Sequence, residues 1–246
     1  MRIEMLFPDV ANLHGDNFNV TYLSQCRPDS KVIRTLLNDT PAFVTTAVDL
    51  IYLGPMSERS QRWVIERLWR HRGRIAELIE NGTTFLFTHN AMEVLGERII
   101  DVTSGRDTTA LGIFPFTTSV DTGARINSKV IGDVAGARVV GYKSQFSSIW
   151  ETAALPCFLE ASRGLGRNRE TCLEGVHVNN FFGTSLLGPL LIMNPLFTKE
   201  LLKLMDSNVA PTLAYEKESM AAYQARLTDF ADTSRWHPRE KVTGER

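Results

Sequence analysis

Short apolar runs alternate with amphipathic segments along the first hundred residues of the chain. The runs at residues 2–7, 48–54 and 83–87 are rich in β-branched and aromatic residues and end at Gly, Pro or polar residues, which is typical of buried strands. Residues 32–37 fit either a strand or a helix. We therefore expect these runs to form the first strands of a buried sheet.

Helical spacing is strongest over residues 57–81, where Trp63, Leu68, Ile75 and Leu78 recur and Asn-Gly ends the segment. A break is expected near Gly73. Shorter helices are predicted around residues 20–26, before a proline, and from residue 195 onward. The strand, helix, strand order predicts a βαβ unit and a parallel sheet.

The residue pattern changes over residues 111–142, where short β-like runs are separated by glycines. We interpret this region as the antiparallel edge of a mixed sheet. Residues 175–183 are expected to add one further strand. A single domain is predicted over residues 1–228, and the polar residues 229–246 are expected to form a flexible tail.

Three predicted strands end at what should be the ligand-binding edge of the sheet. Parallel strands present their carboxyl ends together, so the loops after Phe7, Leu53 and Phe87 should open onto one crevice. The third loop joins a strand to a helical run, as a nucleophile elbow does. Its residues 88–91 are Thr, His, Asn and Ala, which include no Ser or Cys.

Composition limits the partners and the compartment. The formal net charge of −1 and the pI near 6.5 give no electrostatic reason to expect nucleic acid or an anionic membrane. Three cysteines without metal-site spacing, and no apolar run long enough for a bilayer, favour a cytoplasmic protein without membrane insertion. The arginines of residues 59–74 indicate either a solvated helix face or a surface for an acidic partner.

Five blocks of sequence carry a longer pattern. They are Phe-Pro-Asp-Val-Ala-Asn-Leu-His-Gly-Asp at residues 7–16 with its continuation to residue 20, residues 49–61, residues 88–96, Leu-Gly-Ile-Phe at 111–114, and Glu-Gly-Val at 174–176 with Gly-Thr-Ser-Leu-Leu-Gly-Pro-Leu-Leu at 183–191. In this order they resemble the class I glutamine amidotransferases of the cobyric acid synthase-like branch, and most of all the glutaminase subunits of lipid II isoglutaminyl synthases. The resemblance spans about residues 1 to 205.

This resemblance implies an α/β, flavodoxin-like fold with a mixed, mostly parallel central sheet flanked by helices. It also implies glutamine hydrolysis by a Cys-His pair without a cofactor, and ammonia transfer to an ATP-dependent ligase. The chain departs from that chemistry: the nucleophile position is His89, the base position is Leu187, and Pro55 in the oxyanion turn lacks an N–H. The substrate stretch of the family also differs here, at residues 141–147.

We therefore expect a degenerate amidotransferase subunit without glutaminase activity, acting as scaffold or regulator of a Mur ligase-like synthetase in a heterodimer for peptidoglycan precursor amidation. The resemblance places a vestigial pocket, with no metal, at Asn12, Asp16, Gly54, Thr88, Asn90 and Arg125. Two alternatives stay open. One is an active subunit with a relocated nucleophile, for which Cys26, Cys157, Cys172 and Thr88 are the candidates. The other is a small-molecule sensor in the old glutamine pocket.

Overall fold

A central six-stranded sheet organises the molecule. The computed structural model describes residues 1–235, and five of the six strands run parallel. Their order across the sheet is β13 (Val176–Val178), β14 (Phe181–Thr184), β4 (Thr84–Thr88), β3 (Leu50–Leu53), β1 (Arg2–Leu6) and β2 (Lys31–Thr35). The predicted α/β class with a mixed, mostly parallel sheet is confirmed, and the ambiguous residues 32–37 fall mainly in a strand.

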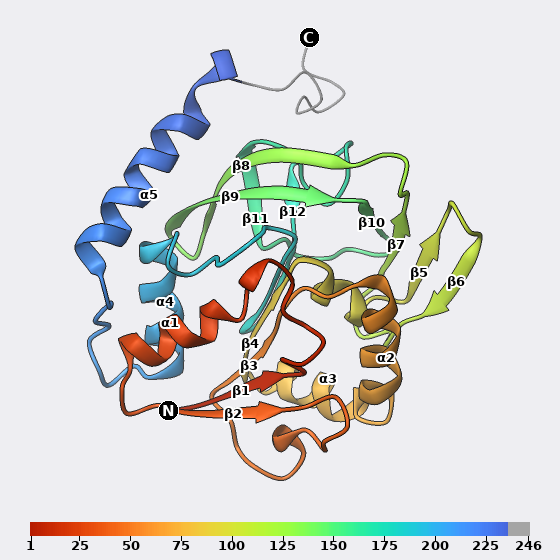
Figure 1. Cartoon of the computed structure of the whole chain (residues 1–246), viewed down its shortest axis with the longest axis horizontal. Helices are drawn as coiled ribbons and strands as arrows, with labels where there is room; N and C mark the ends of the chain where they lie inside the picture. Colours follow the sequence, from red (N-terminus) through yellow and green to blue (C-terminus); the bar gives the residue numbers. More distant parts are fainter. Residues whose placement is uncertain (236–246) are drawn as a thin grey trace.

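Helices cover both faces of this sheet (Figure 1). Helices α2 (Glu58–Trp69) and α3 (Arg72–Glu80) pack on one face through apolar residues such as Val64, Leu68 and Ile75. Helices α1 (Phe18–Cys26) and α4 (Pro195–Met205) pack on the other face. The expected break in the long helical segment occurs at Arg70 and His71, just before Gly73.

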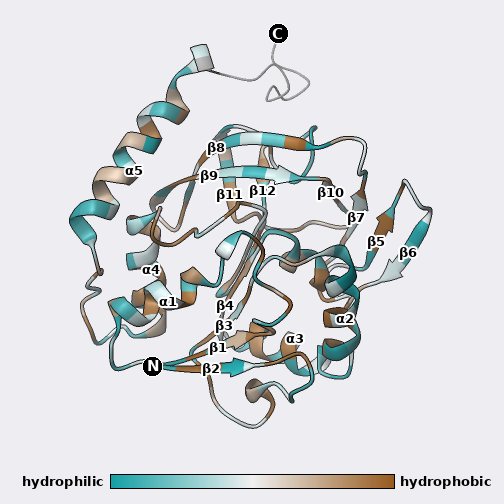
Figure 2. Cartoon of the chain, in the orientation of Figure 1, coloured by the Kyte–Doolittle hydropathy of each residue, from teal (hydrophilic) through white to brown (hydrophobic). Residues whose placement is uncertain are grey.

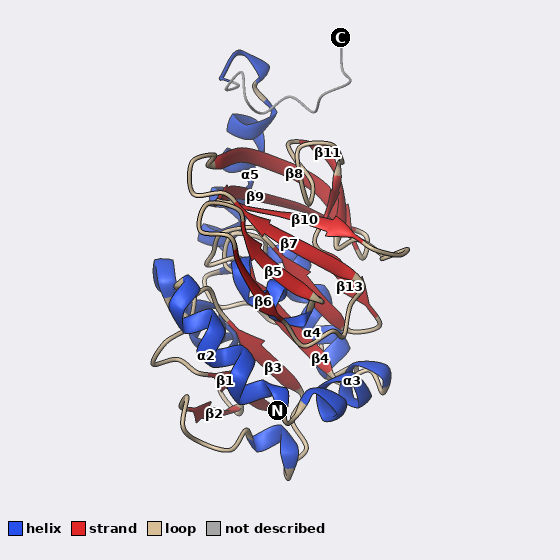
Figure 3. Cartoon of the chain, turned by 90° about the vertical axis from the view of Figure 1, so that its right-hand side faces the viewer, coloured by secondary structure: helices blue, strands red, loops and turns tan. Residues whose placement is uncertain are grey.

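The eight strands between β4 and β13 correct the sequence prediction. They form two further four-stranded sheets instead of an antiparallel edge of the central sheet, and the three sheets lie one above another in Figure 3. One sheet contains β5 (Arg98–Asp101), β6 (Arg106–Thr109), β7 (Phe116–Val120) and β10 (Ser147–Glu151), and the other contains β8 (Ile126–Val134), β9 (Ala137–Gln145), β11 (Leu159–Arg163) and β12 (Leu173–Glu174). Strands such as β7 bury alternate residues, whereas β3, β4 and β14 are buried throughout. A strand with one buried face suits a separate covering layer.

Two more elements differ from the prediction. Residues 175–183 form a hairpin of β13 and β14 in place of one strand, because Asn179 turns the chain at φ 51°. Helix α5 (Glu216–Ala231) was not predicted. It enters the proposed tail, η4 (Thr233–Arg235) follows it, and residues 236–246 lie outside the described residues. The domain boundary at residue 228 stays a prediction.

Candidate functional site

A cleft of about 210 Å³ lies at the carboxyl ends of β1, β3 and β4, as the strand pattern predicted. Its wall includes residues from the loops after these three strands and from β9 and the turn into β10. The lining residues are Leu13, His14, Met56, Ser57, Glu58, Gln61, His89, Asn90, Glu93, Val120, Arg125, Ser144, Gln145, Phe146 and Ser147.

His89 stands on a strained turn at the floor of this cleft. Strand β4 ends at Thr88, His89 has a left-handed φ of 54°, and the 3-10 helix η3 (His89–Leu95) begins there. A nucleophile elbow has this same strand, strained residue and helix arrangement. The sharp turn is therefore present, with an imidazole in place of a thiol or hydroxyl.

The imidazole of His89 is engaged with its surroundings. Its Nε2 lies 3.2 Å from the carbonyl oxygen of Ser144, which can only accept, so Nε2 carries the hydrogen. Its ring meets the His14 ring edge-on at a centroid distance of 6.0 Å. Burial lowers the pKa of His89, and the neutral form is therefore favoured near pH 7.

The side chain of Asn90 is hydrogen-bonded to the backbone of Met56, in the loop after β3. The Met56 N–H donates to Asn90 Oδ1 at 3.0 Å, and Asn90 Nδ2 donates to the Met56 carbonyl at 2.7 Å. Pro55, one residue earlier, has no N–H. The family resemblance places the oxyanion turn at residues 54–56, where the Met56 N–H would be a donor. That donor is already satisfied within the chain.

Asp16 and Thr88 lie beneath the elbow and not in the cleft. The Thr88 hydroxyl donates to Asp16 Oδ2, and the Tyr52 hydroxyl donates to the Asp16 carbonyl at 2.8 Å. Both Asp16 and Thr88 are fully buried, and burial raises the pKa of Asp16 against the lowering effect of its hydroxyl donors. These contacts fix the loop after β1 to the end of β4.

The other proposed pocket residues divide between loop and cleft. Asn12 accepts a hydrogen bond from the Asn17 N–H at 3.1 Å, and Gly54 packs so closely that a Cβ would lie 3.0 Å from the Tyr52 hydroxyl. Arg125 does line the cleft. It donates from Nη1 to Ser144 Oγ at 3.0 Å and stacks 4.2 Å from the ring centre of Phe146.

A buried carboxyl in the cleft wall was missed from the sequence. Gln61 Nε2 donates to Glu93 Oε2 at 3.0 Å and to the Asn90 carbonyl at 2.8 Å, so α2 is tied to η3. Burial raises the pKa of Glu93 from 4.5 to about 7, although hydrogen bonds from Ser147 and Gln61 oppose the rise. The available signal was a polar Gln61 on the same helix face as Val64, Ile65 and Leu68.

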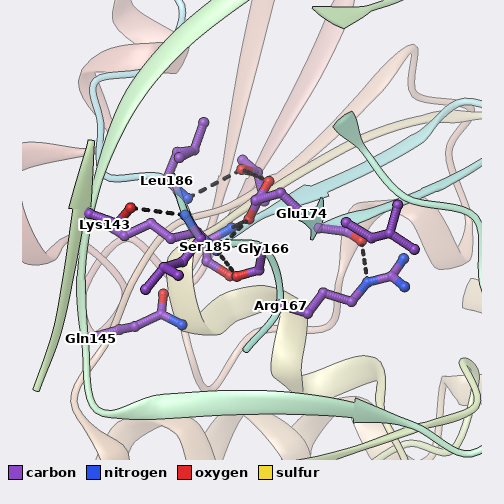
Figure 4. Close-up of polar contacts among 12 residues, drawn as sticks. Lys143, Gln145, Gly166, Arg167, Glu174, Ser185 and Leu186 are labelled. Atoms are coloured by element: carbon purple, nitrogen blue, oxygen red, sulfur yellow. Dashed lines mark hydrogen bonds and ion pairs between the residues drawn. The ribbon is translucent and has the colours of Figure 1, made fainter. Parts of the chain in front are cut away.

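A buried ion pair anchors the segment that precedes Leu187 (Figure 4). Lys143 Nζ lies 3.3 Å from Glu174 Oε1 and donates to the Gly166 carbonyl at 2.6 Å. Glu174 also accepts from the Ser185 N–H at 2.8 Å. Leu187 follows this anchored segment and donates its N–H to the Tyr142 carbonyl, two residues along β9 from Ser144. The proposed base position therefore adjoins the cleft wall but has an aliphatic side chain.

Comparison with known proteins connects this geometry to a family. No family model matches the chain. It is 27% identical over 221 residues to the GatD subunit of the glutamine-hydrolysing lipid II isoglutaminyl synthase of Staphylococcus aureus, covering 89% of this chain and 90% of that protein. The GatD subunit of Streptococcus pneumoniae is 23% identical, over 79% of this chain and 76% of that protein. The chain is a homologue of GatD.

Solved structures agree on the fold of this GatD homologue. A crystal structure of a glutamine amidotransferase superposes with a TM-score of 0.55 at 12% identity, covering 82% of this chain and 98% of that one. A glutamine amidotransferase from Thermotoga maritima gives a TM-score of 0.52 at 8% identity, covering 94% and 96% of the two chains. The chain therefore has the glutamine amidotransferase fold.

The three thiols of the GatD homologue lie elsewhere in the described structure. Cys26 is buried on α1, where its Sγ accepts from the Ala214 N–H at 3.4 Å. Burial raises the pKa of Cys26 and Cys157. Cys172 contacts Glu160 Oε1 at 3.8 Å. None of these residues is among those that line the cleft.

Within residues 1–235, no group of three or more His, Cys, Asp and Glu side chains is placed to hold a metal ion. His177 lies on β13, and its ring stacks on that of Phe182 with a centroid distance of 4.5 Å. Across the described part of the chain, no helix combines the length and apolar character needed to cross a membrane.

Proposed function

We propose that this chain is a non-hydrolysing, GatD-like subunit that serves as scaffold or regulator of a Mur ligase-like synthetase in cell-wall precursor amidation. The observation that carries the proposal is the elbow itself. It has the strained turn of a nucleophile-bearing loop, but its residue is a neutral His89 and the adjacent Met56 N–H is bonded to Asn90. Attack on a glutamine amide needs a thiolate and free oxyanion donors; the elbow residue supplies no thiolate, and the Met56 donor is already bonded to Asn90.

The side chains that surround the elbow support the same interpretation. The proposed base position, Leu187, cannot accept a proton. Thr88, a candidate for a relocated nucleophile, is fully buried, and its hydroxyl points to Asp16. A hydroxyl that already donates to a buried carboxylate cannot reach a substrate in the cleft. The raised thiol pKa of Cys26 and Cys157 counts against a relocated cysteine.

The test is glutamate release from glutamine by the purified chain, alone and after co-expression with a Mur ligase-like synthetase, beside an active GatD. We expect no release together with a stable complex. Release that one of Cys157→Ala, Cys172→Ala, Thr88→Ala or His89→Ala abolishes would establish the relocated-nucleophile alternative. Absence of a complex would refute the scaffold role.

One observation favours a second candidate, a small-molecule sensor. The cleft remains open at about 210 Å³ and contains the cationic Arg125 beside the hydroxyl of Ser144. A ligand that binds only the folded state raises its melting temperature by mass action. A panel of amino acids that leaves the melting temperature unchanged would exclude those ligands.

A further inference from the structure

Helix α2 and the start of α3 present an arginine surface on the outside of the molecule. We use this name for Arg59, Arg62, Arg67, Arg70 and Arg72 together with the exposed rings of Trp63 and Trp69. Figure 2 colours much of α2 hydrophilic, and Figure 3 shows the helix on the outside of the central sheet. The sequence left open whether these arginines form a solvated face or meet an acidic partner.

The charges of the arginine surface are balanced only in part by its neighbours, since Glu66 lies among the arginines and Asp39 lines a hollow with Arg67 and Arg70. Residues 59–74 contain six arginines and one glutamate, a net charge of +5, although the whole chain has a formal net charge of −1. Arg74 pairs with Glu77 at 2.9 Å. Within residues 1–235, no carboxylate lies within 4.0 Å of a side-chain nitrogen of the five surface arginines.

The arginine surface departs only in part from the charge pattern of a solvated helix face. Such faces place opposite charges three or four residues apart, which stabilises the helix. Glu58 with Arg62, Arg62 with Glu66 and Glu66 with Arg70 follow that rule at a spacing of four. The pairs Arg59 with Arg62 and Arg67 with Arg70 instead repeat like charges at a spacing of three, which destabilises the helix. An acidic partner would offset this repulsion, whereas water and salt only screen it.

The rings and a hollow add an apolar component to the arginine surface. The guanidinium groups of Arg59 and Arg72 lie 4.8 Å and 4.7 Å from the ring centres of Trp63 and Trp69. Trp63 and Trp69 are 38% and 40% exposed as whole residues. Beside them, Leu37, Trp63, Glu66 and Arg67 line a hollow of about 190 Å³. Trp and Arg are the residue types that contribute most often to binding at protein interfaces.

We infer that the arginine surface docks an acidic protein segment, whose carboxylates pair with Arg59, Arg67 and Arg70 and whose apolar side chain enters the hollow beside Trp63. The inference rests on the proposed function for its partner, since α2 also supplies Glu58 and Gln61 to the cleft. A synthetase subunit that covers the cleft would therefore lie beside this surface. Complementary charge across such a contact would steer association and fix its register.

The first experiment measures the surface without the synthetase. A fluorescein-labelled peptide with a central Leu-Phe pair flanked by Asp and Glu is titrated with the full chain by fluorescence anisotropy. The test variant is Arg59→Gln/Arg67→Gln/Arg70→Gln. The matched control is Lys31→Gln/Lys203→Gln/Lys217→Gln, which removes the same charge at exposed positions elsewhere. Circular dichroism melts confirm that both variants fold, and Trp63→Ser tests the apolar component with no change of charge.

We expect saturable peptide binding that weakens with salt, falls at least about tenfold in the arginine variant and is unchanged in the lysine control. Trp63→Ser should also weaken it. No binding, equal binding by the arginine variant, or tighter binding of a basic peptide or a single-stranded DNA oligomer would overturn the inference. So would loss of peptide binding through self-association of the chain at the same surface, detected by gel filtration.

The second experiment separates this inference from the proposed function. Co-expressed synthetase is captured with the wild-type chain and with both triple variants. Capture by all three would leave the scaffold role intact and overturn the arginine surface as its contact. If only the arginine variant fails to capture the synthetase, the result supports both the scaffold role and the arginine surface as its contact. If the wild type captures no synthetase but binds the peptide through its arginines, the scaffold role fails and the acidic-segment surface stands.

Discussion

Restoring a cysteine at position 89 alone should not restore glutamine hydrolysis. His89→Cys puts a thiol on the strained turn that the fold already provides. Two requirements remain unmet, because Leu187 cannot move a proton and Asn90 occupies the Met56 N–H at 3.0 Å. A general base contributes about 10²- to 10⁴-fold and one oxyanion donor about 10²- to 10³-fold. The single variant should therefore release glutamate at least about 10⁴-fold more slowly than an active GatD.

The two requirements can be measured one at a time. His89→Cys/Leu187→His adds a base, and Asn90→Gly in that background frees the Met56 N–H. We expect the triple variant to exceed the double variant by roughly 10²-fold, which is the value of one oxyanion donor. His89→Cys/Asn90→Gly without the new histidine is the matched control, since its deficit from the triple variant reports the base alone.

The assay is glutamate release under single-turnover conditions, with iodoacetamide labelling across pH to measure the thiolate fraction at position 89. Labelling without turnover in His89→Cys would show that the thiol is accessible and that the missing groups limit the reaction. The reasoning would be refuted by glutamate release from the wild type, or by a His89→Cys rate within tenfold of the active control.

Two further predictions concern buried charge near the cleft. The Glu93 carboxyl, with its pKa raised from 4.5 to about 7, stays protonated in the folded chain over a pH range where the unfolded chain has lost that proton. Folding stability should therefore fall as pH rises through this range, by up to about 3 kcal/mol. Glu93→Gln should remove this slope in thermal melts from pH 5 to pH 8, whereas Glu80→Gln, on the exposed end of α3, should not; parallel wild-type and Glu93→Gln curves would contradict the assignment. Lys143→Met leaves the buried Glu174 carboxylate without its ion-pair partner. The free energy of unfolding, measured with urea, should fall by about 3–5 kcal/mol. Lys143→Met/Glu174→Gln should recover most of that loss, and an equal loss in both variants would mean that packing, not charge, is responsible.

The sequence was sufficient for the inner strands β1, β3 and β4 of the central sheet because these strands carry their own signal. Strands β3 and β4 are short, mainly apolar runs bounded by Gly, Pro or polar residues, and their length, flanks and aromatic content favour an inner strand over a buried helix. The separate sheets could not be predicted in the same way. Alternating burial in β7 shows that one face is covered, but not by which layer. Helix α5 buries only Ser219, Tyr223 and Phe230, so its periodicity was too weak to find.

The sequence predicted where in the fold the candidate site lies, but not which side chains contact one another there. The loops after β1, β3 and β4 meet because parallel strands end together. The amide pair of Asn90 with Met56 joins residues 34 positions apart, and the Gln61 contact to Glu93 spans 32. Such pairings depend on the registry of elements that only the folded chain defines. The burial of Asp16 and Thr88 beneath the turn was hidden for the same reason.

The strained turn at His89 has a structural explanation that needs no catalysis. A left-handed conformation at a residue other than Gly costs of order 1–3 kcal/mol, so its surroundings must hold it. Here β4 is fixed between β3 and β14, and η3 buries Met92, Val94 and Leu95 directly after the turn. Straightening His89 would pull these side chains from the core, at about 1.5–3 kcal/mol for each one exposed. The core alone can therefore maintain an elbow that no longer holds a nucleophile.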